Sequence, residues 1–397
     1  MFRHVSKINV SIWGRRVGSL VGVPDRRGYA FRYDRAFLSS GIEIAPLTMP
    51  LGSQPYHFPD LPSQDYGGLP PVFADSLPDS FGSALIDGWL TTHGLSKDEI
   101  TPLDRLAYLG RRAMGALSYE PEHGPRSVGT ALDLRKLVED ARDVTNGELL
   151  DKVSDDALLT ILRLGSSAGG AQAKAVIGWN RSTDQFVYGD REVPEGFEHW
   201  IIKFTPKDYP WRGQREYDLY RRACDAGVEM SPSVLYEADG LKHFMTRRFD
   251  RTADGRRRHV QTLSAIAHFP TATPPEFRSY DRLFAVADEL GVSYGEKEQL
   301  FARMAFNVLC GECDDHVKNF SFMLDEGDRW RIAPAYDLTG SDFPDADPWS
   351  AHGRMHQLSI NGKRVAVDDS DLLAVADRFA IGTAPRVLNG IKEAFGK

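Results

Sequence analysis

Hydrophobic residues recur with helical spacing in some segments of this chain and alternate with polar residues in others. In the clearest helical run, six apolar side chains share one face: Leu300, Phe301, Met304, Ala305, Val308 and Leu309. Such a stripe predicts an amphipathic helix packed against a core. Gly311 follows, and glycine readily adopts the left-handed turn that ends many helices. The pattern therefore predicts a buried helix that ends directly before a charged segment.

The same patterns assign most other segments. Alternating apolar and polar residues predict strands within 8–33, and short apolar runs predict strands at 175–179 and 200–204. Further strands are predicted at 242–250 and 330–338. Helical spacing predicts helices at 83–93, 102–110, 127–163, 214–226, 280–290, 370–380 and 384–395. Residues 46–82 are dense in proline and glycine and predict a rigid, packed connector. From Thr262 onward the chain is predicted to be mostly helical.

Chain length and composition bound the class of protein. A chain of 397 residues is long enough for two or three domains. A proline-rich linker pattern at 120–125 marks the first boundary, and we predict three parts: 1–125, 126–250 and 251–397. Hydrophobic residues make up 42% of the chain and charged residues 26%, which is typical of a soluble globular protein.

Net charge and cysteine usage narrow the class further. A net charge of −8 argues against a protein that coats DNA or lies on a membrane surface. No apolar run approaches the roughly 18 residues that a membrane span needs. The 3 cysteines favour a reducing compartment without a disulfide framework, so we expect a cytoplasmic protein. Cys310 and Cys313 form one C-x-x-C pair, and without a second pair neither zinc nor redox chemistry is expected.

The charged segment after the predicted buried helix is the strongest candidate for chemistry. It runs from Cys313 to Asn319 and contains two aspartates, a histidine and a lysine. Asp314 and Asn319 are five residues apart, as are the aspartate and asparagine of the protein-kinase catalytic loop. In that loop the aspartate accepts the proton of the attacking hydroxyl and the asparagine holds magnesium. The alternative is a solvated charged loop.

Four further features stand in the order that protein kinases use. The small-residue run 165–174 lets backbone amides approach phosphate, although a plain flexible hairpin would explain it too. Lys203 lies within an apolar strand pattern, where a buried ammonium needs a partner such as phosphate or Glu216. The alternative for Lys203 is a strand edge that faces water. Asp337 follows a predicted strand and supplies a second carboxylate for magnesium.

One charged segment has a plainer interpretation. Residues 256–259, Arg-Arg-Arg-His, follow a predicted strand and are expected at a hairpin tip. We predict that they form solvated surface, with contact to an acidic partner as the alternative.

Six stretches of the chain together resemble the HipA family of serine/threonine kinases, the toxin half of HipBA toxin–antitoxin systems. They are 69–79, 110–117, 167–174, 248–251, 314–321 and 335–338. The matches span nearly the whole chain, and their combination is far more specific than any one of them. The resemblance implies an α+β fold: a protein-kinase-like two-lobed core, an additional N-terminal α/β subdomain and a mostly helical C-terminal lobe.

The resemblance also implies roles for individual residues. Asp314 matches the family's catalytic aspartate, while Asn319 and Asp337 match its magnesium ligands. Glu216 would be the partner of the ATP-binding lysine. The expected ATP contacts are Lys203, Gly169, Gly170, Ala171, Gln172, Arg247, Phe249 and His316. Arg247 stands where the family often has glutamate, and Asp315 where some members have a small residue. His316 is expected to brace the loop. Ser167, or its neighbour Ser166, matches the serine that family members autophosphorylate.

Partners follow from the resemblance alone. The expected partner is a HipB-like helix-turn-helix antitoxin, through which DNA would be contacted only indirectly. The expected protein substrate is a translation component such as an aminoacyl-tRNA synthetase, phosphorylated with ATP and Mg²⁺. Two other functions stay open. One is a co-repressor that binds a DNA-binding antitoxin with little kinase activity, and the other is a small-molecule or lipid kinase.

Overall fold

The computed structural model describes residues 3–24, 28–78, 80–125, 131–138, 172–189, 191–271, 273–274, 277–340 and 355–396. The chain forms two compact units. The first comprises Met1–Ala45, Met49–Gly213 and Ser233–Val260, and the second comprises Pro46–Thr48, Gln214–Pro232 and Gln261–Lys397. The helix predicted across 127–163 lies largely outside the described residues, and the three-part division into 1–125, 126–250 and 251–397 stays a prediction.

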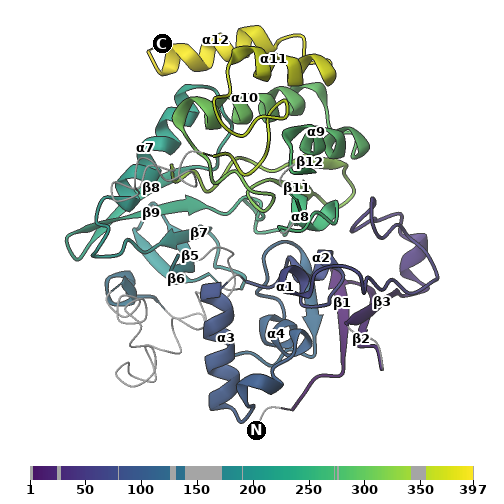
Figure 1. The fold of residues 1–397 in the computed structure, drawn as a ribbon. Helices are drawn as coiled ribbons and strands as arrows, with labels where there is room; N and C mark the ends of the chain where they lie inside the picture. The colour runs from purple at the N-terminus through teal and green to yellow at the C-terminus, as the bar shows by residue number, and fades with distance from the viewer. Residues whose placement is uncertain are drawn as a thin grey trace. The chain divides into compact units, whose positions relative to one another are not determined.

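The first unit begins with an antiparallel sheet whose strand order is β3-β2-β1-β4 (Figure 1). Its strands are β1 (Lys7–Ile12), β2 (Arg15–Gly22), β3 (Tyr29–Tyr33) and β4 (Leu117–Glu120). The alternation expected at 8–12 is confirmed, since Ile8, Val10 and Ile12 are fully buried while the residues between them are not.

Between β3 and β4 the first unit carries short helices. They are η1 (Phe37–Ser39), α1 (Ser63–Tyr66), α2 (Pro71–Ala74), α3 (Ser80–Thr92), η2 (Lys97–Glu99) and α4 (Pro102–Leu109). Thr101 caps α4 by accepting a hydrogen bond from the backbone N–H of Asp104, and Pro102 occupies the first helical position. Both are standard helix-start features, which explains why sequence alone located this helix.

A second sheet of the first unit has the strand order β6-β5-β7-β9-β8 and is antiparallel throughout. Its strands are β5 (Lys174–Asn180), β6 (Gln185–Tyr188), β7 (Glu198–Lys203), β8 (Ser233–Ala238) and β9 (Leu241–Arg247). One face of β5 and β7 contributes Ile177, Trp200 and Ile202 to the hydrophobic core of this unit.

The second unit is mostly helical, as predicted. Its helices are α7 (Arg212–Asp225), which begins at the end of a first-unit segment, α8 (Leu263–Ile266), α9 (Tyr280–Glu289), α10 (Tyr294–Cys310), α11 (Asp369–Arg378) and α12 (Ala384–Ala394). Helices α11 and α12 pack beside α10 (Figure 1). A small sheet has the order β10-β11-β12, with β10 (His259–Thr262), β11 (Ser321–Leu324) and β12 (Trp330–Ile332).

Two predictions need correction. The strand predicted at 330–338 ends at Ile332, so Asp337 lies in the loop beyond β12 and not at a strand end. Residues 256–259 are not uniformly solvated. The Arg256 side chain is 73% exposed, but Arg257 donates hydrogen bonds to three backbone carbonyls and His259 is buried against the carbonyl of Ile44. The number of charges did not predict exposure here, because backbone carbonyls accept hydrogen bonds from the partly buried Arg257 side chain.

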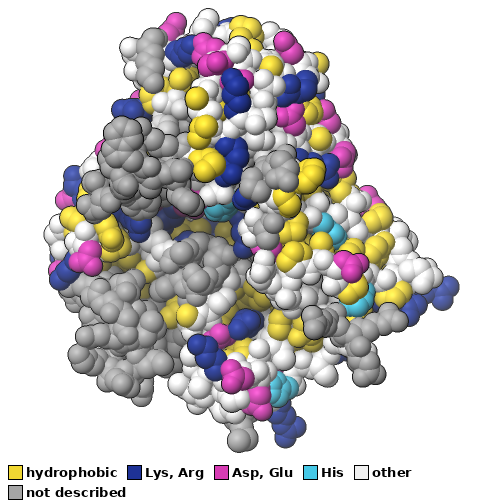
Figure 2. Space-filling model, in the orientation of Figure 1, with side chains coloured by type: hydrophobic (Ala, Val, Ile, Leu, Met, Phe, Trp, Pro, Cys, Tyr) yellow, Lys and Arg dark blue, Asp and Glu magenta, His cyan; other side chains and the backbone are white. Residues whose placement is uncertain are grey.

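On the face drawn in Figure 2, basic and acidic side chains of the described residues lie intermixed. Among these residues, no helix combines the length and the apolarity needed to cross a bilayer.

Candidate active site

The candidate catalytic loop directly follows helix α10 in the second unit. Gly311 has φ +72°, the left-handed conformation expected at a helix end, and it turns the chain out of the helix. The loop is then closed on itself, because the side-chain Nδ2 of Asn319 donates to the backbone carbonyl of Asp314 at 2.8 Å. This bond fixes the amide orientation of Asn319, so its Oδ1 is left to accept from elsewhere.

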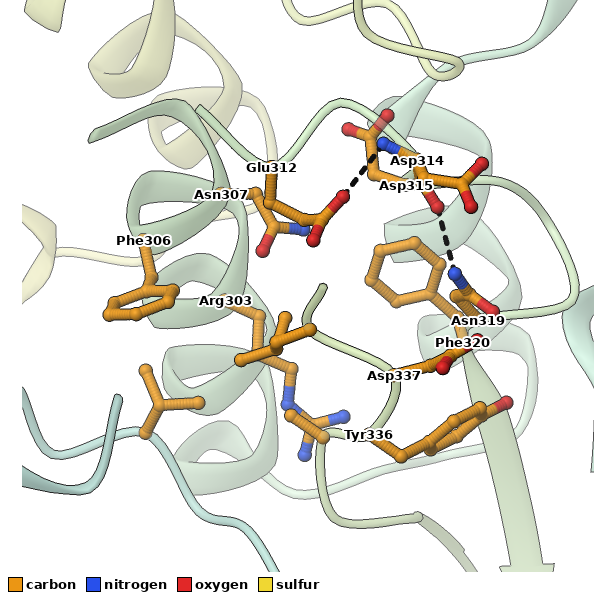
Figure 3. Close-up of a pocket in the computed structure, with 13 residues that line it drawn as sticks. Arg303, Phe306, Asn307, Glu312, Asp314, Asp315, Asn319, Phe320, Tyr336 and Asp337 are labelled. Atoms are coloured by element: carbon orange, nitrogen blue, oxygen red, sulfur yellow. Dashed lines mark hydrogen bonds between the residues drawn. The ribbon is translucent and has the colours of Figure 1, made fainter. Parts of the chain in front are cut away.

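A pocket in the second unit gathers the predicted acidic residues (Figure 3). Its lining is Val228, Arg303, Phe306, Asn307, Glu312, Asp314, Asp315, Asn319, Phe320, Ala335, Tyr336, Asp337 and Leu338. In the view of Figure 3 the side chain of Asp337 extends toward Asn319. The structure therefore brings Asp314, Asn319 and Asp337 to one place.

Asp337 reaches this pocket from a strained backbone. Its φ is +59°, a left-handed conformation that non-glycine residues adopt uncommonly and that aspartate tolerates better than most. Such strain persists only when surrounding contacts hold it, and it is frequent at functional sites.

The electrostatic setting of Asp314 suits a proton acceptor. Its side chain is 57% exposed, and the basic atom found near it in the described part of the chain is Nε2 of His316, at 4.0 Å from Oδ1. Partial burial, together with the charges of Asp337 and Asp315, raises the pKa of Asp314 above its ordinary value, while His316 opposes the shift. A carboxylate that is not neutralised by a close cation retains the basicity that proton abstraction needs.

Asp315, by contrast, is a structural carboxylate. It is 1% exposed, and its two oxygens accept from the hydroxyl of Tyr280 at 2.8 Å, from Nδ1 of His356 at 2.9 Å and from the backbone N–H of Gln357 at 2.6 Å. A buried carboxylate with this many donors has no face left for substrate. This supports the preference for Asp314 over Asp315 as the base.

His316 braces the loop, as predicted. Its Nδ1 accepts from the backbone N–H of Lys318 at 3.2 Å, and its carbonyl accepts from the N–H of Asn319 at 2.8 Å. A nucleotide contact by His316 stays a prediction.

The predicted nucleotide-binding lysine lies in the first unit. Lys203 is the last residue of β7, is 7% exposed and has its Nζ 5.8 Å from the ring centroid of Phe244. It is therefore not a strand-edge lysine that faces water. Its cross-strand neighbour on β5 is Lys174, which is 5% exposed. Residues directly opposite in an antiparallel pair project from the same face, so two buried lysines adjoin there.

Sequence reasoning missed Lys174 as a candidate. Lys174 is the last residue of the small-residue run, and in the sequence nothing distinguishes it from the other polar residues there. Only the register of β5 against β7 places it opposite Lys203. The second missed residue is Glu312, which is 2% exposed and accepts from the backbone N–H of Asp314 at 2.8 Å. No periodic pattern marked it.

The other predicted nucleotide residues are placed as follows. The side chain of Gln172 donates to the carbonyl of Phe204 at 3.0 Å, and Arg247 forms an ion pair with Glu198 at 2.8 Å. Phe249 is partly buried. Glu216 is buried on α7 in the second unit, and its pairing with Lys203 stays a prediction. Gly169, Gly170, Ala171, Ser166 and Ser167 lie outside the described residues.

The donor set of the pocket fits magnesium better than softer metals. Asn319 and Asp337 offer oxygen atoms, and magnesium is commonly held by one or two protein oxygens together with substrate phosphates and water. Among the described residues, no group of three or more His, Cys, Asp and Glu side chains forms a self-sufficient metal cage.

Comparison with known proteins identifies the family. A model of the HipA-like C-terminal domain matches residues 166–396, and a model of the HipA N-terminal domain matches residues 8–120. The chain belongs to the HipA family. The resemblance expected from the six sequence stretches is confirmed, and the N-terminal match shows that the family likeness extends beyond the domain that holds Asp314.

Three relatives illustrate the range of similarity. Y4mE of Sinorhizobium fredii is named as a kinase. It is 26% identical over 394 residues, covering 91% of this chain and 83% of that protein. A Haemophilus influenzae protein with the same kind of name is 22% identical over 160 residues, covering 37% of this chain and 47% of that protein. This chain thus matches about half the length of the Haemophilus protein.

The third is a solved structure, HipA of Shewanella oneidensis in complex with HipB and its operator DNA. It superimposes with a TM-score of 0.68 at 17% identity, covering 98% of this chain and 91% of that chain. At this identity the likeness shows the fold alone. The predicted α+β, kinase-like HipA fold is confirmed.

Proposed function

We propose that this HipA-family chain is an ATP- and magnesium-dependent serine/threonine protein kinase. The observation that carries the proposal is the meeting of Asp314, Asn319 and Asp337 in one pocket, with Asn319 fixed to the backbone of Asp314. An aspartate base, an asparagine and a later aspartate are the constellation that protein kinases use for phosphoryl transfer.

In the proposed reaction the hydroxyl oxygen of the acceptor forms a bond to the γ-phosphorus of ATP. The bond from that phosphorus to the bridging oxygen breaks, and ADP leaves. Asp314 accepts the hydroxyl proton on its exposed carboxylate. Magnesium, when bound by Asn319 and Asp337, would neutralise charge on the phosphates. Because transfer passes through a loose transition state, positioning by these residues matters more than covalent chemistry.

The lysine pair supports the phosphate-binding part of the proposal. Lys174 and Lys203 lie directly opposite each other on adjacent strands and are both buried, so two ammonium-bearing side chains project from the same face of the sheet. Lysine ammonium groups are common binders of phosphate oxygens. We assign Lys203 and Lys174 to the nucleotide phosphates, together with the small-residue run that includes Gly169, Gly170, Ala171 and Gln172. The adenine contacts of Arg247 and Phe249 belong to the same proposal.

The deciding experiment is mass spectrometry of the intact protein and its peptides after incubation with ATP and Mg²⁺. Wild type is expected to gain phosphate on Ser167 or Ser166, and Asp314→Asn to gain none. A phosphoserine there carries about −1.5 to −2 charges and would repel nucleotide phosphates. Absence of phosphate on wild type, and on any cellular protein added with it, would rule the kinase out. Labelling of small hydroxyl compounds alone would favour a small-molecule kinase.

One observation favours a second function beside the first. HipA of Shewanella oneidensis was solved with HipB and operator DNA, so we propose a HipB-like antitoxin as the partner of this chain as well. Toxin and co-repressor functions separate in a growth assay. If toxicity in the cytoplasm depends on phosphoryl transfer, Asp314→Asn relieves growth arrest while leaving antitoxin binding intact. Unchanged toxicity of Asp314→Asn would show that the toxicity does not come from phosphoryl transfer.

The most specific part of the proposal is the identity of the protein that accepts the phosphoryl group. A synthetase substrate, which the resemblance implies, is tested by incubating purified aminoacyl-tRNA synthetases with wild type and Asp314→Asn. Phosphate on a synthetase with wild type alone is the expected result.

A further inference from the structure

We propose that Glu312 is a positioning residue that ties the Asp314 loop to the loop that carries Asp337, and so sets the spacing of the metal site. This inference rests on the proposed function, because it names the device that holds the same site together. Glu312 touches neither substrate nor metal in the proposal. It acts through the two loops it joins.

The contacts of Glu312 are made by both carboxylate oxygens. Oε1 accepts from the backbone N–H of Asp314 at 2.8 Å, which Figure 3 shows as a dashed line. Oε2 accepts from the backbone N–H of Thr339 at 2.8 Å and from that of Gly340 at 2.7 Å. One side chain thus joins residue 314 to residues 339–340, at the two loops that line the pocket.

Burial makes these bonds strong and necessary. Glu312 is 2% exposed, so its charge depends on the three N–H donors for stabilisation. Burial raises the pKa of Glu312, while the backbone N–H groups of Gly340, Asp314 and Thr339 oppose that shift. A buried carboxylate that keeps its donors at both ends resists separation of the two loops, since each donor would otherwise remain unpaired.

A carboxylate is the group that satisfies both ends. All three partners are backbone N–H donors, so each end of the side chain must accept. A glutamine offers one oxygen and one NH₂, and its NH₂ would face a donor at one end or the other. Glu312→Gln can therefore keep one loop contact but loses the other, with almost no change in shape.

The position of the bridge explains why it bears on the metal site. Thr339 and Gly340 are two and three residues beyond Asp337, whose φ of +59° is unusual for a residue other than glycine. Their N–H groups are anchored by Glu312, and the anchor helps to hold the left-handed turn that presents Asp337 to the pocket. Partners that orient metal ligands in this way typically contribute about 10–100-fold to metal affinity or activity.

The test compares Glu312→Gln with a matched control, Glu296→Gln. Glu296 is also a bridging carboxylate of the second unit with a side chain only 16% exposed. It accepts from the backbone N–H groups of Ser293 and Ile332 and from Arg329, away from the pocket. The readouts are Mn²⁺ affinity by electron paramagnetic resonance with saturating ADP, ADP affinity in EDTA, thermal unfolding, and amide hydrogen exchange of the segment 337–340.

We expect Glu312→Gln to weaken Mn²⁺ binding by about tenfold or more, to leave ADP affinity in EDTA within twofold, and to speed exchange at 337–340. Glu296→Gln should lower the melting temperature to a similar degree without changing Mn²⁺ affinity. Glu312→Asp keeps two acceptors on a shorter stem and should recover part of the Mn²⁺ affinity. It also serves as the test variant should Glu312→Gln not fold.

The outcomes separate this inference from the proposed function. Mn²⁺ affinity of Glu312→Gln and Glu312→Asp within twofold of wild type overturns the bridge even if wild type transfers phosphate. Weakened Mn²⁺ binding in a protein whose wild type transfers no phosphate upholds the bridge and refutes the kinase. Failure of wild type to bind Mn²⁺ with ADP overturns both.

Discussion

Two aspartates of this protein, Asp250 and Asp314, each lie in a cluster of charged residues but differ in burial, in partners and in the direction of their pKa shift. Asp250, in the first unit, is fully buried and ion-paired with Arg248 and Arg251 at 2.7 and 2.8 Å, and it accepts from the backbone N–H of Gly115 at 2.8 Å. Despite burial, these partners hold its pKa well below the ordinary range. Asp314, in the second unit, has a 57% exposed side chain and a raised pKa.

The difference shows that a carboxylate neutralised by buried partners serves the fold, whereas an exposed carboxylate can take part in a reaction. The Asp250 cluster joins two of the stretches that carry the family resemblance, 110–117 and 248–251, and every charge-bearing oxygen there has a donor. The Asp314 cluster leaves its outermost carboxylate exposed and satisfies the inner ones, Glu312 and Asp315. A carboxylate in such a cluster is therefore available to react only where its oxygens are not already taken up by hydrogen-bond donors and ion pairs.

The largest expected effect follows from removing the exposed carboxylate. Asp314→Asn should lower the phosphoryl-transfer rate by about 10²–10⁴-fold, the usual contribution of a general base. The melting temperature should stay close to that of wild type, because this side chain is largely exposed. Radiolabelled phosphate incorporation and calorimetry measure the two quantities. A phosphoryl-transfer rate equal to that of wild type would mean that a residue other than Asp314 is the general base.

The matching change in the saturated cluster should act on folding instead. Asp250→Asn removes one partner from a buried ionic network and should lower the free energy of unfolding by about 3–5 kcal/mol, as measured by urea denaturation. The control is Asp254→Asn, which breaks an exposed pair with Arg256 and should leave unfolding unchanged. Equal stability of Asp250→Asn and wild type would mean that the network does not hold the 110–117 and 248–251 stretches together.

A third change probes the two buried lysines that lie opposite each other on β5 and β7 of the first unit. Lys203→Ala should weaken ATP binding by about 1–3 kcal/mol through loss of a charge-assisted contact, and Lys174→Ala should act in the same direction. Isothermal titration calorimetry checks both, with Lys242→Ala on the exposed side of β9 as the control. Unchanged affinity in both lysine variants would remove the pair from the nucleotide site.

The last prediction concerns the pH dependence of stability. Burial, followed by the charges of Arg248 and Arg251, lowers the pKa of His199 to about 3. The unfolded chain binds this proton below about pH 6.5 and the folded chain does not. Stability contributed by His199 is thus present above pH 6.5 and is lost toward pH 3, by about 1.4 kcal/mol per pH unit.

His199→Gln keeps a donor for the carbonyl of Gly189, which the imidazole contacts at 3.2 Å. Urea denaturation between pH 7 and pH 4 should show a shallower loss of stability in this variant. An identical slope in both proteins would mean that His199 takes up its proton in the folded state.

The sequence by itself determined most local structure and the order of the chemistry. Helical spacing and Gly311 located the end of α10, alternation located β1, and short apolar runs located β5 and β7, because these patterns record which residues of a segment are buried. The five-residue step from Asp314 to Asn319 lies within one loop, so it too could be read locally. The family resemblance came from the same kind of local stretch.

Only the tertiary structure decided which polar residues meet. Gly115 and Asp250 are 135 residues apart, and Glu312 reaches Gly340 across 28 residues. Neither contact leaves a periodic trace in the sequence. The register of β5 against β7 places Lys174 opposite Lys203. Arg257 is partly buried because its guanidinium donates hydrogen bonds to backbone carbonyls such as that of Leu117. Periodicity reports burial along one segment, whereas the pairing of buried charges depends on which segments the fold brings together.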